Sequence, residues 1–442
     1  MVFRLRDFIF YPAAINRCRT FLDKSQYWSQ EKRREWTREQ LDRVLWHAVR
    51  NVPYYKRTLG PYEPRFKEML DRLDLSELPL ITKDLIRKHY QELQANNPGH
   101  SRSRESHTSG SSGTPMQFLL DRSSDTNHFA AIWRVLNWTG YKFGNRFACI
   151  NTTMETETEQ LFVYDFKQNC LNFPFVNLKK DNIKKCVTRL KKFNPVVIKS
   201  YPSALALFSH WLRDVGIRDY RPKAVLTCAE TLLDHQKKII SEVLECPIFD
   251  FYNQNERACL FSTCGEGRYH IHEEYSFVEL LNSESLPAAP GESAEIITTG
   301  FHNFVMPLIR YQTNDLAVID EGNPCECGRT YKTVERVIGR IEDMIVTPRG
   351  RHVSRMDIPF KYSPGIQEGQ IIQKQVDKIK VNVLKADSYK QKDLDNLLHH
   401  MHLRLGEDMK IEYDFVDSIP LGENGKKKFI VSKLNLERPS NA

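Results

Sequence analysis

Apolar residues recur every three to four positions through residues 25–60, and this spacing predicts helix with one buried face. Trp28, Trp36 and Val44 lie on that face. Asn51-Val52-Pro53 ends the run, because proline cannot continue a helix and restricts the residue before it. The first long element of the chain is therefore expected to be helical.

Between residue 117 and about residue 300, short apolar runs alternate with helical patterns. This rhythm is typical of an α/β domain, in which helices cover a mixed or parallel sheet. The predicted strands are 196–198, 224–226, 247–249, 277–281, 294–298 and 316–319, and the predicted helices are 203–215 and 233–244.

After Gly339 the pattern changes to a compact region of roughly 100 residues. It combines strand patterns with a helix at 394–405 and a further strand at 410–415, which is typical of a small α+β domain. We therefore expect an α/β large N-terminal domain over 1–341, with mixed sheets and flanking helices. A small mobile α+β C-terminal domain is expected over 342–442.

Composition and charge fit an enzyme. The chain has 442 residues, 40% of them hydrophobic and 27% charged, and disordered or fibrous classes are excluded on these values. Its net charge is 64 − 56 = +8, a mild excess that suits anionic ligands such as nucleotides. A dedicated nucleic-acid binder would be more strongly and locally basic, so no nucleic-acid partner is expected. The lysine pairs at 179–180, 184–185 and 191–192 recur at helical spacing and predict one solvated helix face.

The sequence predicts no transmembrane segment, because no apolar run reaches the roughly 18 residues that span a bilayer. Residues 1–22 mix arginines with aromatic residues and favour an ordinary amphipathic helix, with a peripheral membrane contact as the alternative. Ten cysteines without a secretory signal indicate reduced thiols or a metal site. We therefore expect a cytoplasmic protein.

A Ser/Thr/Gly-rich segment interrupts the globular pattern at residues 101–115. Its core reads Thr108-Ser109-Gly110-Ser111-Ser112-Gly113-Thr114-Pro115. Hydroxyls and exposed backbone N–H groups are the donors that phosphate oxygens need, and glycines let the backbone approach closely. No Gly-Lys-Ser/Thr follows, so it is not a Walker loop. The alternative is a flexible linker.

This segment resembles the phosphate loop of the adenylate-forming superfamily, which includes acyl-CoA synthetases, peptide-synthetase adenylation domains and luciferases. Further family-like segments follow in the family's order across most of the chain. The resemblance is greatest to the phenylacetate–CoA ligase branch and its capsular-polysaccharide-biosynthesis relatives. It implies a ligase that uses ATP and Mg²⁺ to convert a small-molecule carboxylate into an acyl-AMP. It also implies that the large domain binds ATP and the carboxylate. The implied phosphate-binding residues are Thr108, Ser109, Gly110, Ser111, Ser112, Gly113 and Thr114.

Two further segments resemble the family's adenine and metal motifs. In Phe251-Tyr252-Asn253-Gln254-Asn255-Glu256, the resemblance places Tyr252 along the adenine and assigns Glu256 to Mg²⁺. Asn253 stands where the family usually has glycine. Ala229-Glu230-Thr231 resembles the adenine-side segment and assigns Glu230 to the nucleotide site. Taken alone, either glutamate could equally be a surface acid.

The most family-specific stretch is Pro307 to Asp315, in which Asp315 takes the place of the aspartate that binds both ribose hydroxyls. Gly339-Arg340-Ile341-Glu342-Asp343 resembles the hinge, with Arg340 contacting the nucleotide and Glu342 at the hinge position. Pro420 to Lys426 resembles the motif that carries the catalytic lysine, here Lys426. The alternative for that last motif is a solvated basic tail.

The cysteines suggest a second site. Cys325 and Cys327 form a tight Cys-x-Cys, and Cys264 and His270 lie upstream near glycines. Three thiolates and one imidazole make a closed tetrahedral zinc site of the structural type. Some members of the phenylacetate–CoA ligase branch look similar here. Cys259 is an alternative ligand.

The family resemblance implies two half-reactions, between which the small domain rotates about Glu342 and withdraws Lys426. Features such as Trp133, Trp138 and Tyr141 resemble the capsular-polysaccharide relatives, so an amine or sugar in surface-polysaccharide or O-antigen synthesis is the favoured acceptor. An acyl- or aryl-CoA ligase that uses coenzyme A is the alternative. A catalytically inactive nucleotide-binding relative is a third reading, motivated by Asn253 and by the lack of a lysine after Pro115.

Overall fold

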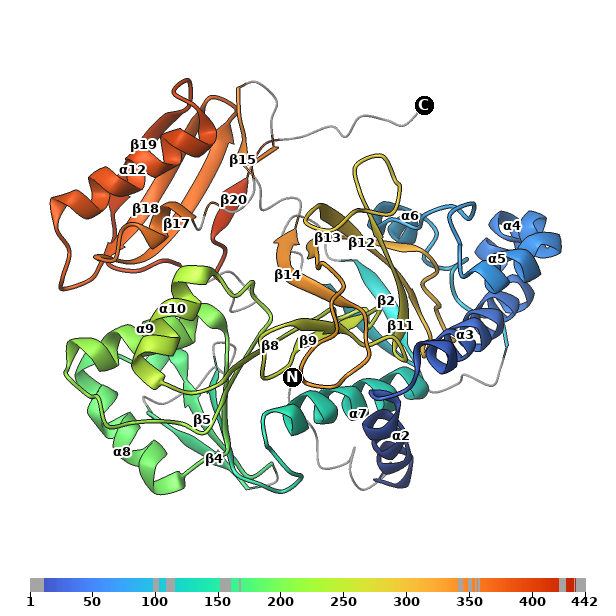
Figure 1. Ribbon diagram of the computed structural model, residues 1–442, viewed down its shortest axis with the longest axis horizontal. Coiled ribbons are helices and arrows are strands. Elements are labelled where there is room, and N and C mark those ends of the chain that lie inside the picture. Colours follow the sequence, from blue (N-terminus) through green and yellow to red (C-terminus); the bar gives the residue numbers. More distant parts are fainter. Residues whose placement is uncertain are drawn as a thin grey trace. The chain divides into compact units, whose positions relative to one another are not determined.

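The computed structural model describes residues 12–97, 103–108, 116–151, 160–166, 168–340, 345–348, 352–353, 356, 358–420, 427–432 and 434. The chain forms two compact units (Figure 1). Unit 1 comprises Met1–Asn145 and Phe249–Val337, and unit 2 comprises Arg146–Ile248 and Ile338–Ala442. A large mixed α/β region is followed by a small C-terminal α+β domain, so the predicted fold class is confirmed.

Unit 1 begins with helices. They are α2 (Pro12–Ser25), α3 (Gln30–Asn51), α4 (Pro53–Thr58), α5 (Phe66–Arg72), α6 (Lys83–Lys88) and α7 (Arg122–Trp138). The side-chain oxygen of Ser29 caps α3 by accepting the N–H of Lys32 at 3.2 Å. The helix ends at the predicted place, because Pro53 opens the next helix α4.

The strands of unit 1 form an antiparallel hairpin and a larger antiparallel array. The hairpin is β1 (Arg104–His107) with β2 (Gln117–Leu120). The larger array contains β8 (Ile248–Asn253), β9 (Leu260–Thr263), β10 (Tyr269–Ile271), β11 (Ser276–Leu281), β12 (Ser293–Gly300), β13 (Tyr311–Ile319) and β14 (Thr333–Arg340). Its neighbours follow the order β11-β12-β13-β14-β10-β9-β8.

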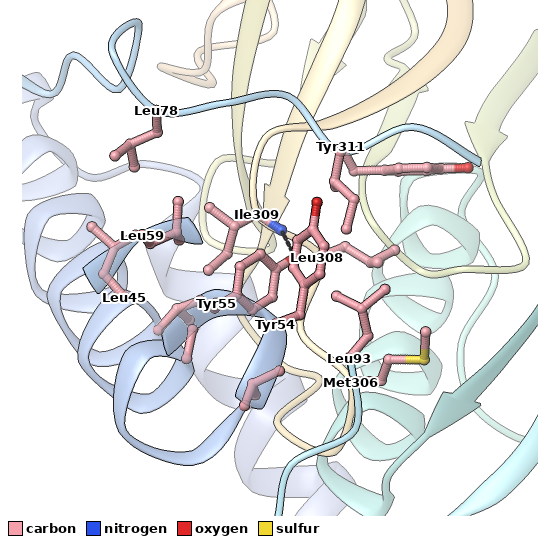
Figure 2. Close-up of a cluster of buried hydrophobic side chains, with 14 of the residues drawn as sticks. Leu45, Tyr54, Tyr55, Leu59, Leu78, Leu93, Met306, Leu308, Ile309 and Tyr311 are labelled. Carbon is pink, nitrogen blue, oxygen red and sulfur yellow. Dashed lines mark hydrogen bonds between the residues drawn. The ribbon is translucent and has the colours of Figure 1, made fainter. Parts of the chain in front are cut away.

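The core of unit 1 connects its helices to the segment that precedes β13 (Figure 2). Leu45 and Leu59 pack with Leu308 and Ile309 in one buried cluster. The hydroxyl of buried Tyr55 accepts the N–H of Ile309 at 3.2 Å and donates to the carbonyl oxygen of Pro307 at 3.0 Å. Helix α4 therefore fixes the chain just before the strand that carries Asp315.

Unit 2 contains a parallel array flanked by helices. Its strands are β3 (Phe147–Asn151), β4 (Val163–Asp165), β5 (Cys170–Pro174), β6 (Val197–Ser200) and β7 (Val225–Cys228), and its helices here are α8 (Ile183–Phe193), α9 (Pro202–Asp214) and α10 (Asp234–Leu244). The order is β7-β6-β3-β5-β4, parallel except for the edge strand β4. The lysines of α8 at 184, 185, 191 and 192 are exposed, as predicted, and its apolar residues are buried.

The small C-terminal domain lies in unit 2 and contains a sheet covered by one long helix. Its elements are β15 (Ile345–Val346), β16 (His352–Val353), α11 (Ile358–Lys361), β17 (Ile366–Gln375), β18 (Lys378–Lys385), α12 (Gln391–Leu405), β19 (Lys410–Phe415) and β20 (Ile430–Ser432). The order is β19-β18-β17-β20 (Figure 1). Leu394, Leu397 and Met401 of α12 share a core with Ile371 and Val381 of the sheet.

Within the part of the chain that the structure describes, no helix combines the length and the apolar character needed to cross a bilayer. Helix α2 accounts for the C-terminal half of the predicted N-terminal helix, and residues 1–11 lie outside the described residues.

Candidate active site

The predicted phosphate loop is anchored at both ends by Thr108 and Met116. The N–H of Thr108 donates to the carbonyl oxygen of Met116 at 2.9 Å, and the N–H of Met116 donates to the Thr108 hydroxyl oxygen at 2.8 Å. These bonds continue the β1–β2 hairpin, which favours a functional loop over a linker. Residues 109–115 lie outside the described residues.

The base of this loop contacts the segment that carries Glu256. The side-chain amide of Asn255 donates to the carbonyl oxygen of His107 at 3.3 Å. His107 is the last residue of β1, and Glu256 is the neighbour of Asn255. Two predicted motifs that are about 150 residues apart in sequence therefore meet in unit 1.

Asp315 and Tyr252 form the second meeting point of predicted residues. The Tyr252 hydroxyl donates to Asp315 Oδ2 at 2.6 Å, and the amide of Gln254 approaches both groups. Burial, and then the charge of Asp315, raises the pKa of Tyr252 well above its usual value, so the phenol remains a donor. Thr313 accepts the N–H of Asp315 at 3.0 Å. The aspartate predicted to hold the ribose is thus oriented by its own strand and by the predicted adenine-side tyrosine.

Glu256 is held by Tyr311. The carboxylate is 7% exposed, and its Oε1 accepts the Tyr311 hydroxyl at 2.8 Å. Tyr311 and Asp315 both belong to β13, but the strand is irregular between them: its register with β12 shifts, and Asn314 has φ 65°. This irregular strand therefore supplies both a partner of the predicted magnesium ligand and the predicted ribose ligand itself.

The substitution of asparagine for the family's glycine does not distort this segment. Asn253 ends β8 as a regular strand residue opposite Leu260 and is absent from the residues with positive φ. The left-handed position falls instead on Arg257, with φ 57°. Its guanidinium pairs with Asp125, which contributes to holding that conformation. The backbone at Asn253 is therefore that of a regular strand.

The predicted zinc ligands meet in unit 1. The ligand atoms of Cys264, His270, Cys325 and Cys327 all lie within 4.8 Å of one another. Cys264 Sγ is 3.6 Å from Cys325 Sγ, and Cys327 Sγ is 3.4 Å from His270 Nε2. A tetrahedron with Zn–S of about 2.3 Å and Zn–N of about 2.0 Å has ligand–ligand separations of roughly 3.5–3.8 Å. The donor set and spacing therefore fit a closed Cys₃His zinc site.

The loop that supplies two of these thiols is fixed by Arg268. Its guanidinium pairs with Asp320 at both carboxylate oxygens, with Nε to Oδ2 at 2.9 Å, and donates to the carbonyl oxygen of Asn323 at 2.8 Å. Burial, assisted by the charge of Arg329, lowers the pKa of His270 to about 4. The imidazole is therefore neutral near pH 7, which is the form that binds metals.

The alternative zinc ligand Cys259 lies elsewhere. Its thiol donates to the side-chain oxygen of Gln254 at 3.5 Å, beside the Tyr252–Asp315 pair, and it is not part of the four-residue cluster. His272 is a core histidine with both ring nitrogens satisfied. Its Nε2 contacts the Ser262 hydroxyl at 2.7 Å, and its Nδ1 contacts Arg134. Both residues are fully buried.

In unit 2, Glu230 lies in the loop after β7. Its Oε2 accepts the N–H of Ser203 at 3.1 Å, and its Oε1 accepts the N–H of Lys427 at 2.8 Å. Burial raises the pKa of Glu230, and these two hydrogen bonds oppose that rise. Ala229, just before it, has φ 70°, a left-handed conformation that turns the chain at the end of the strand.

Several predicted residues have no described side chain. Lys426 and Glu342 lie outside the described residues, and Arg340 ends β14 with only its backbone described. Gly339 beside it has φ 101°, a conformation that only glycine adopts readily, and it begins the segment that resembles the family's hinge.

Comparisons with known proteins agree with this geometry. Residues 345–433 match the family model described as the CapK C-terminal domain. Protein CapK of Staphylococcus aureus is 23% identical over 82% of this chain and 81% of its own length. A phenylacetate–coenzyme A ligase of Thermus thermophilus is 24% identical over 72% of each chain. The chain is homologous to CapK and to the phenylacetate–coenzyme A ligases.

Solved structures establish the fold. A 2-hydroxyisobutyryl-CoA ligase, in the postadenylation state in complex with R3-HIB-AMP, superimposes with a TM-score of 0.71 at 16% identity, over 92% of this chain and 93% of its own. An anthranilate CoA ligase in complex with anthranoyl-AMP gives a TM-score of 0.54 at 15% identity, over 83% and 75%. The CapK relative thus has the fold of these CoA ligases, as the resemblance to ligases led us to expect.

Sequence reasoning missed Tyr311 and Gln254 as partners of the predicted ligands. Tyr311 could have been found, because it stands four residues before Asp315 and strand side chains repeat every second position. Gln254 carried no comparable signal, since its contact with Asp315 depends on how β8 and β13 meet in the fold.

Proposed function

We propose that this CapK relative activates a carboxylic acid with ATP as an acyl-AMP and transfers the acyl group to an amine or sugar of a surface or capsular polysaccharide or O-antigen. The observation that carries the first step is that β13 supplies both Tyr311 and Asp315. Tyr311 there orients Glu256, and Asp315 bonds to Tyr252, beside the base of the Ser/Thr/Gly loop. Carboxylates fixed by neutral donors can hold a cation and a ribose without a change of conformation.

The unit 1 residues then have defined roles. Thr108 and the loop 109–114 bind phosphate, Tyr252 and Asn253 border the adenine, and Asp315 accepts the ribose hydroxyls. Glu256 holds Mg²⁺, which neutralises charge on the phosphates when it is bound. The buried position of Glu256 and its Tyr311 donor support this role, because among the described residues its carboxylate forms no ion pair, and such an anionic oxygen suits a hard cation.

The C-terminal motif completes the first half-reaction. Lys426 bridges the attacking carboxylate and the α-phosphate, which stabilises charge as it builds in the transition state. Arg340 contacts the nucleotide, and the segment at Glu230 borders the adenine. Rotation of the small domain (342–442) about Glu342 then withdraws Lys426 from the large domain (1–341) for acyl transfer. The match of residues 345–433 to the CapK C-terminal domain supports a separate functional module here.

Cys264, His270, Cys325 and Cys327 hold a structural zinc ion that clamps the loops around β10 and residues 320–327. All four positions of the tetrahedron are supplied by the protein, so the zinc has no open position for chemistry. Ten cysteines free of disulfide bonds support a reducing, cytoplasmic location.

A coenzyme A acceptor is the second candidate. It is favoured by the homology to phenylacetate–coenzyme A ligases and by the likeness to 2-hydroxyisobutyryl-CoA ligase. The amine or sugar acceptor is favoured by the greater coverage of CapK and by the CapK-type C-terminal domain. Both candidates share the acyl-AMP step, so only the second half-reaction distinguishes them.

Pyrophosphate release tests the proposal. The protein is incubated with ATP, Mg²⁺ and a panel of aryl acids, fatty acids, amino acids and uronic-acid nucleotide sugars, each with and without coenzyme A. Release that depends on an acid and increases with an amine or sugar acceptor supports the polysaccharide ligase. An increase with coenzyme A alone would instead identify an acyl-CoA ligase.

The inactive-relative reading is tested with Lys426→Ala. If the protein is a ligase, this variant should lose adenylation by a factor of about 100 or more while still binding ATP. Unchanged adenylation would contradict the role of Lys426. ATP binding without pyrophosphate release in the unmodified protein, across the panel, would favour a nucleotide-binding relative.

A further inference from the structure

The Glu230 carboxylate joins two segments that are far apart in the sequence. One oxygen accepts the N–H of Ser203, at the start of α9, and the other accepts the N–H of Lys427, just before β20. Thr231 next to it donates to the carbonyl oxygen of Ile338 at 3.4 Å. The loop after β7 thus contacts the C-terminal part of unit 2 at two places. Both Glu230 contacts use backbone N–H groups, so they do not depend on the identity of the partner side chain.

Lys427 is held a second time within its own domain. Its Nζ donates to Glu368 Oε2 at 2.5 Å, and both side chains are largely buried, at 8% and 11% exposure. The carbonyl oxygen of Lys428 accepts the amide of Gln370 at 3.0 Å. Glu368 and Gln370 belong to β17, which also pairs with β20. Residues 427–432 are therefore held against the small sheet.

Glu368 and Glu230 differ in which parts of the chain they connect. Glu368 and Lys427 both lie in the matched C-terminal domain, so their ion pair moves with that domain. Glu230 lies outside it, after β7, so its bond to the Lys427 N–H exists only when the domain is placed as it is here. In a ligase that rotates this domain between half-reactions, the first contact persists and the second is made and broken.

We infer that Glu230 is a positioning residue for the adenylation step: its carboxylate fixes the backbone of residue 427, one peptide bond after the lysine assigned to catalysis. This inference rests on the proposed function. Consecutive Cα atoms are about 3.8 Å apart, so a fixed residue 427 restricts where residue 426 can start. In this role Glu230 acts through the backbone of residue 427, in addition to the proposed place of its segment beside the adenine.

The energetics favour a contact of this kind. Each hydrogen bond to a carboxylate is modestly stabilising, so the arrangement in which the half-buried Glu230 keeps both backbone donors is preferred over one without Lys427. Neutral amide donors leave the bond breakable, whereas a second buried ion pair at this place would resist domain rotation. Glu230 therefore stabilises the adenylation arrangement without locking it.

Glu230→Ala tests the inference by separating the half-reactions. With an acid identified by the pyrophosphate panel, kcat for adenylation should fall by about 10- to 50-fold. The consumption of synthetic acyl-AMP by the acceptor should fall by a clearly smaller factor, because that step uses the rotated domain and depends on the Glu230 segment only through its place beside the adenine. Glu230→Gln keeps one oxygen as an acceptor and should restore part of the adenylation rate. Equal losses in both half-reactions, or no loss in either, would overturn the inference.

The matched control is the double variant Glu368→Gln/Lys427→Met, which removes both buried charges but keeps the N–H of residue 427. It should lower both half-reactions by similar factors, since the pair belongs to the small domain in either state. A loss confined to adenylation would mean that the Lys427 side chain, not Glu230, is the positioning group, and would also overturn the inference.

Hydrogen exchange tests the contact without any substrate. The amide of residue 427 should exchange at least about tenfold faster in Glu230→Ala than in the unmodified chain, because its acceptor is lost. Unchanged exchange would overturn the contact itself. If the amide becomes exposed as expected but the unmodified protein shows no acid-dependent pyrophosphate release, the proposed function fails and the contact stands. The two failures are therefore distinguishable.

Discussion

A buried pair of carboxylates, Glu256 with Asp315, and the half-buried Glu230 differ in where their partners come from. Glu256 and Asp315 in unit 1 are bound by Tyr311 and Tyr252, all from strands or turns of that unit. Glu230 in unit 2 is bound by the backbone of Lys427, which lies 197 residues away in the C-terminal domain. The pair can stay assembled through a whole reaction cycle, whereas the contact of Glu230 depends on domain position. On the proposed function, the residues assigned to the ribose and to Mg²⁺ are thus separate from the residue that we infer to respond to domain position.

The largest effect is expected from Asp315→Ala. Because the ribose is present both in ATP and in acyl-AMP, kcat/KM should fall by about 100-fold in both half-reactions, as expected for two lost hydrogen bonds to a charged group. Pyrophosphate release and acyl-AMP consumption measure the two steps. Asp414→Asn, on an exposed ion pair with Lys380, is the matched control. If Asp315→Ala lowered only one half-reaction, the expected difference between Asp315, which should affect both steps, and Glu230 would be wrong.

Cys327→Ser should show that the metal cluster stabilises unit 1. The variant should lose a bound zinc ion and the free energy of unfolding should fall by about 3 kcal/mol, since loss of a structural metal is among the costliest single changes. Elemental analysis and urea unfolding measure both. Cys246→Ser, outside the cluster, is the control. Protein purified without zinc, together with an unchanged stability of Cys327→Ser, would contradict the zinc site.

Tyr311→Phe should have a smaller effect, on adenylation. It removes one hydrogen bond to Glu256, worth about 1–1.5 kcal/mol, so the Mg²⁺ concentration needed for half-maximal adenylation should rise by about 5- to 10-fold. Mg²⁺ titrations of pyrophosphate release measure it, with Tyr413→Phe on an exposed strand as the control. An unchanged Mg²⁺ requirement would show that Glu256 does not bind the metal ion.

Acid sensitivity is expected in both units. Burial lowers the pKa of His302 in unit 1 to about 4 and that of His210 in unit 2 to about 3. The folded chain keeps both imidazoles neutral, whereas the unfolded chain binds protons near pH 6.5. Their stabilisation is therefore complete above about pH 6.5 and is lost as pH falls toward 4 and 3, by at most about 1.4 kcal/mol per pH unit for each histidine.

Urea unfolding at pH 7, 5.5 and 4.5 measures that slope. His302→Gln should make the stability of unit 1 less dependent on pH, and His210→Gln should do the same in unit 2. Slopes that match the unmodified protein would show that these imidazoles do not resist protonation.

The sequence predicted most of the regular elements because their patterns are local. The helix at 394–405 and the strand at 410–415 match α12 and β19 closely, since each has one apolar face or a regular alternation. The strand predicted at 316–319 begins in fact at Tyr311. Its first half carries Gln312, Thr313 and Asn314, polar residues that conceal the apolar pattern.

The candidate site was only partly predictable, for a different reason. The zinc ligands could be named from their types, but that Cys264 meets Cys325 is a consequence of tertiary structure. The bond between Glu230 and residue 427 uses a backbone N–H, which every residue except proline carries, so no sequence signal marks it. A sequence can therefore indicate a site that depends on the types of its side chains, but it cannot indicate a contact made by the backbone.

The most direct test of the acyl-AMP step uses an acid that supports pyrophosphate release, labelled with ¹⁸O in its carboxylate. If the carboxylate attacks the α-phosphate, one of its oxygens stays on phosphorus when the acyl group leaves, so mass spectrometry should find AMP with one ¹⁸O. Unlabelled AMP, formed together with acylated product, would show that the acid is activated by another route and would contradict the account.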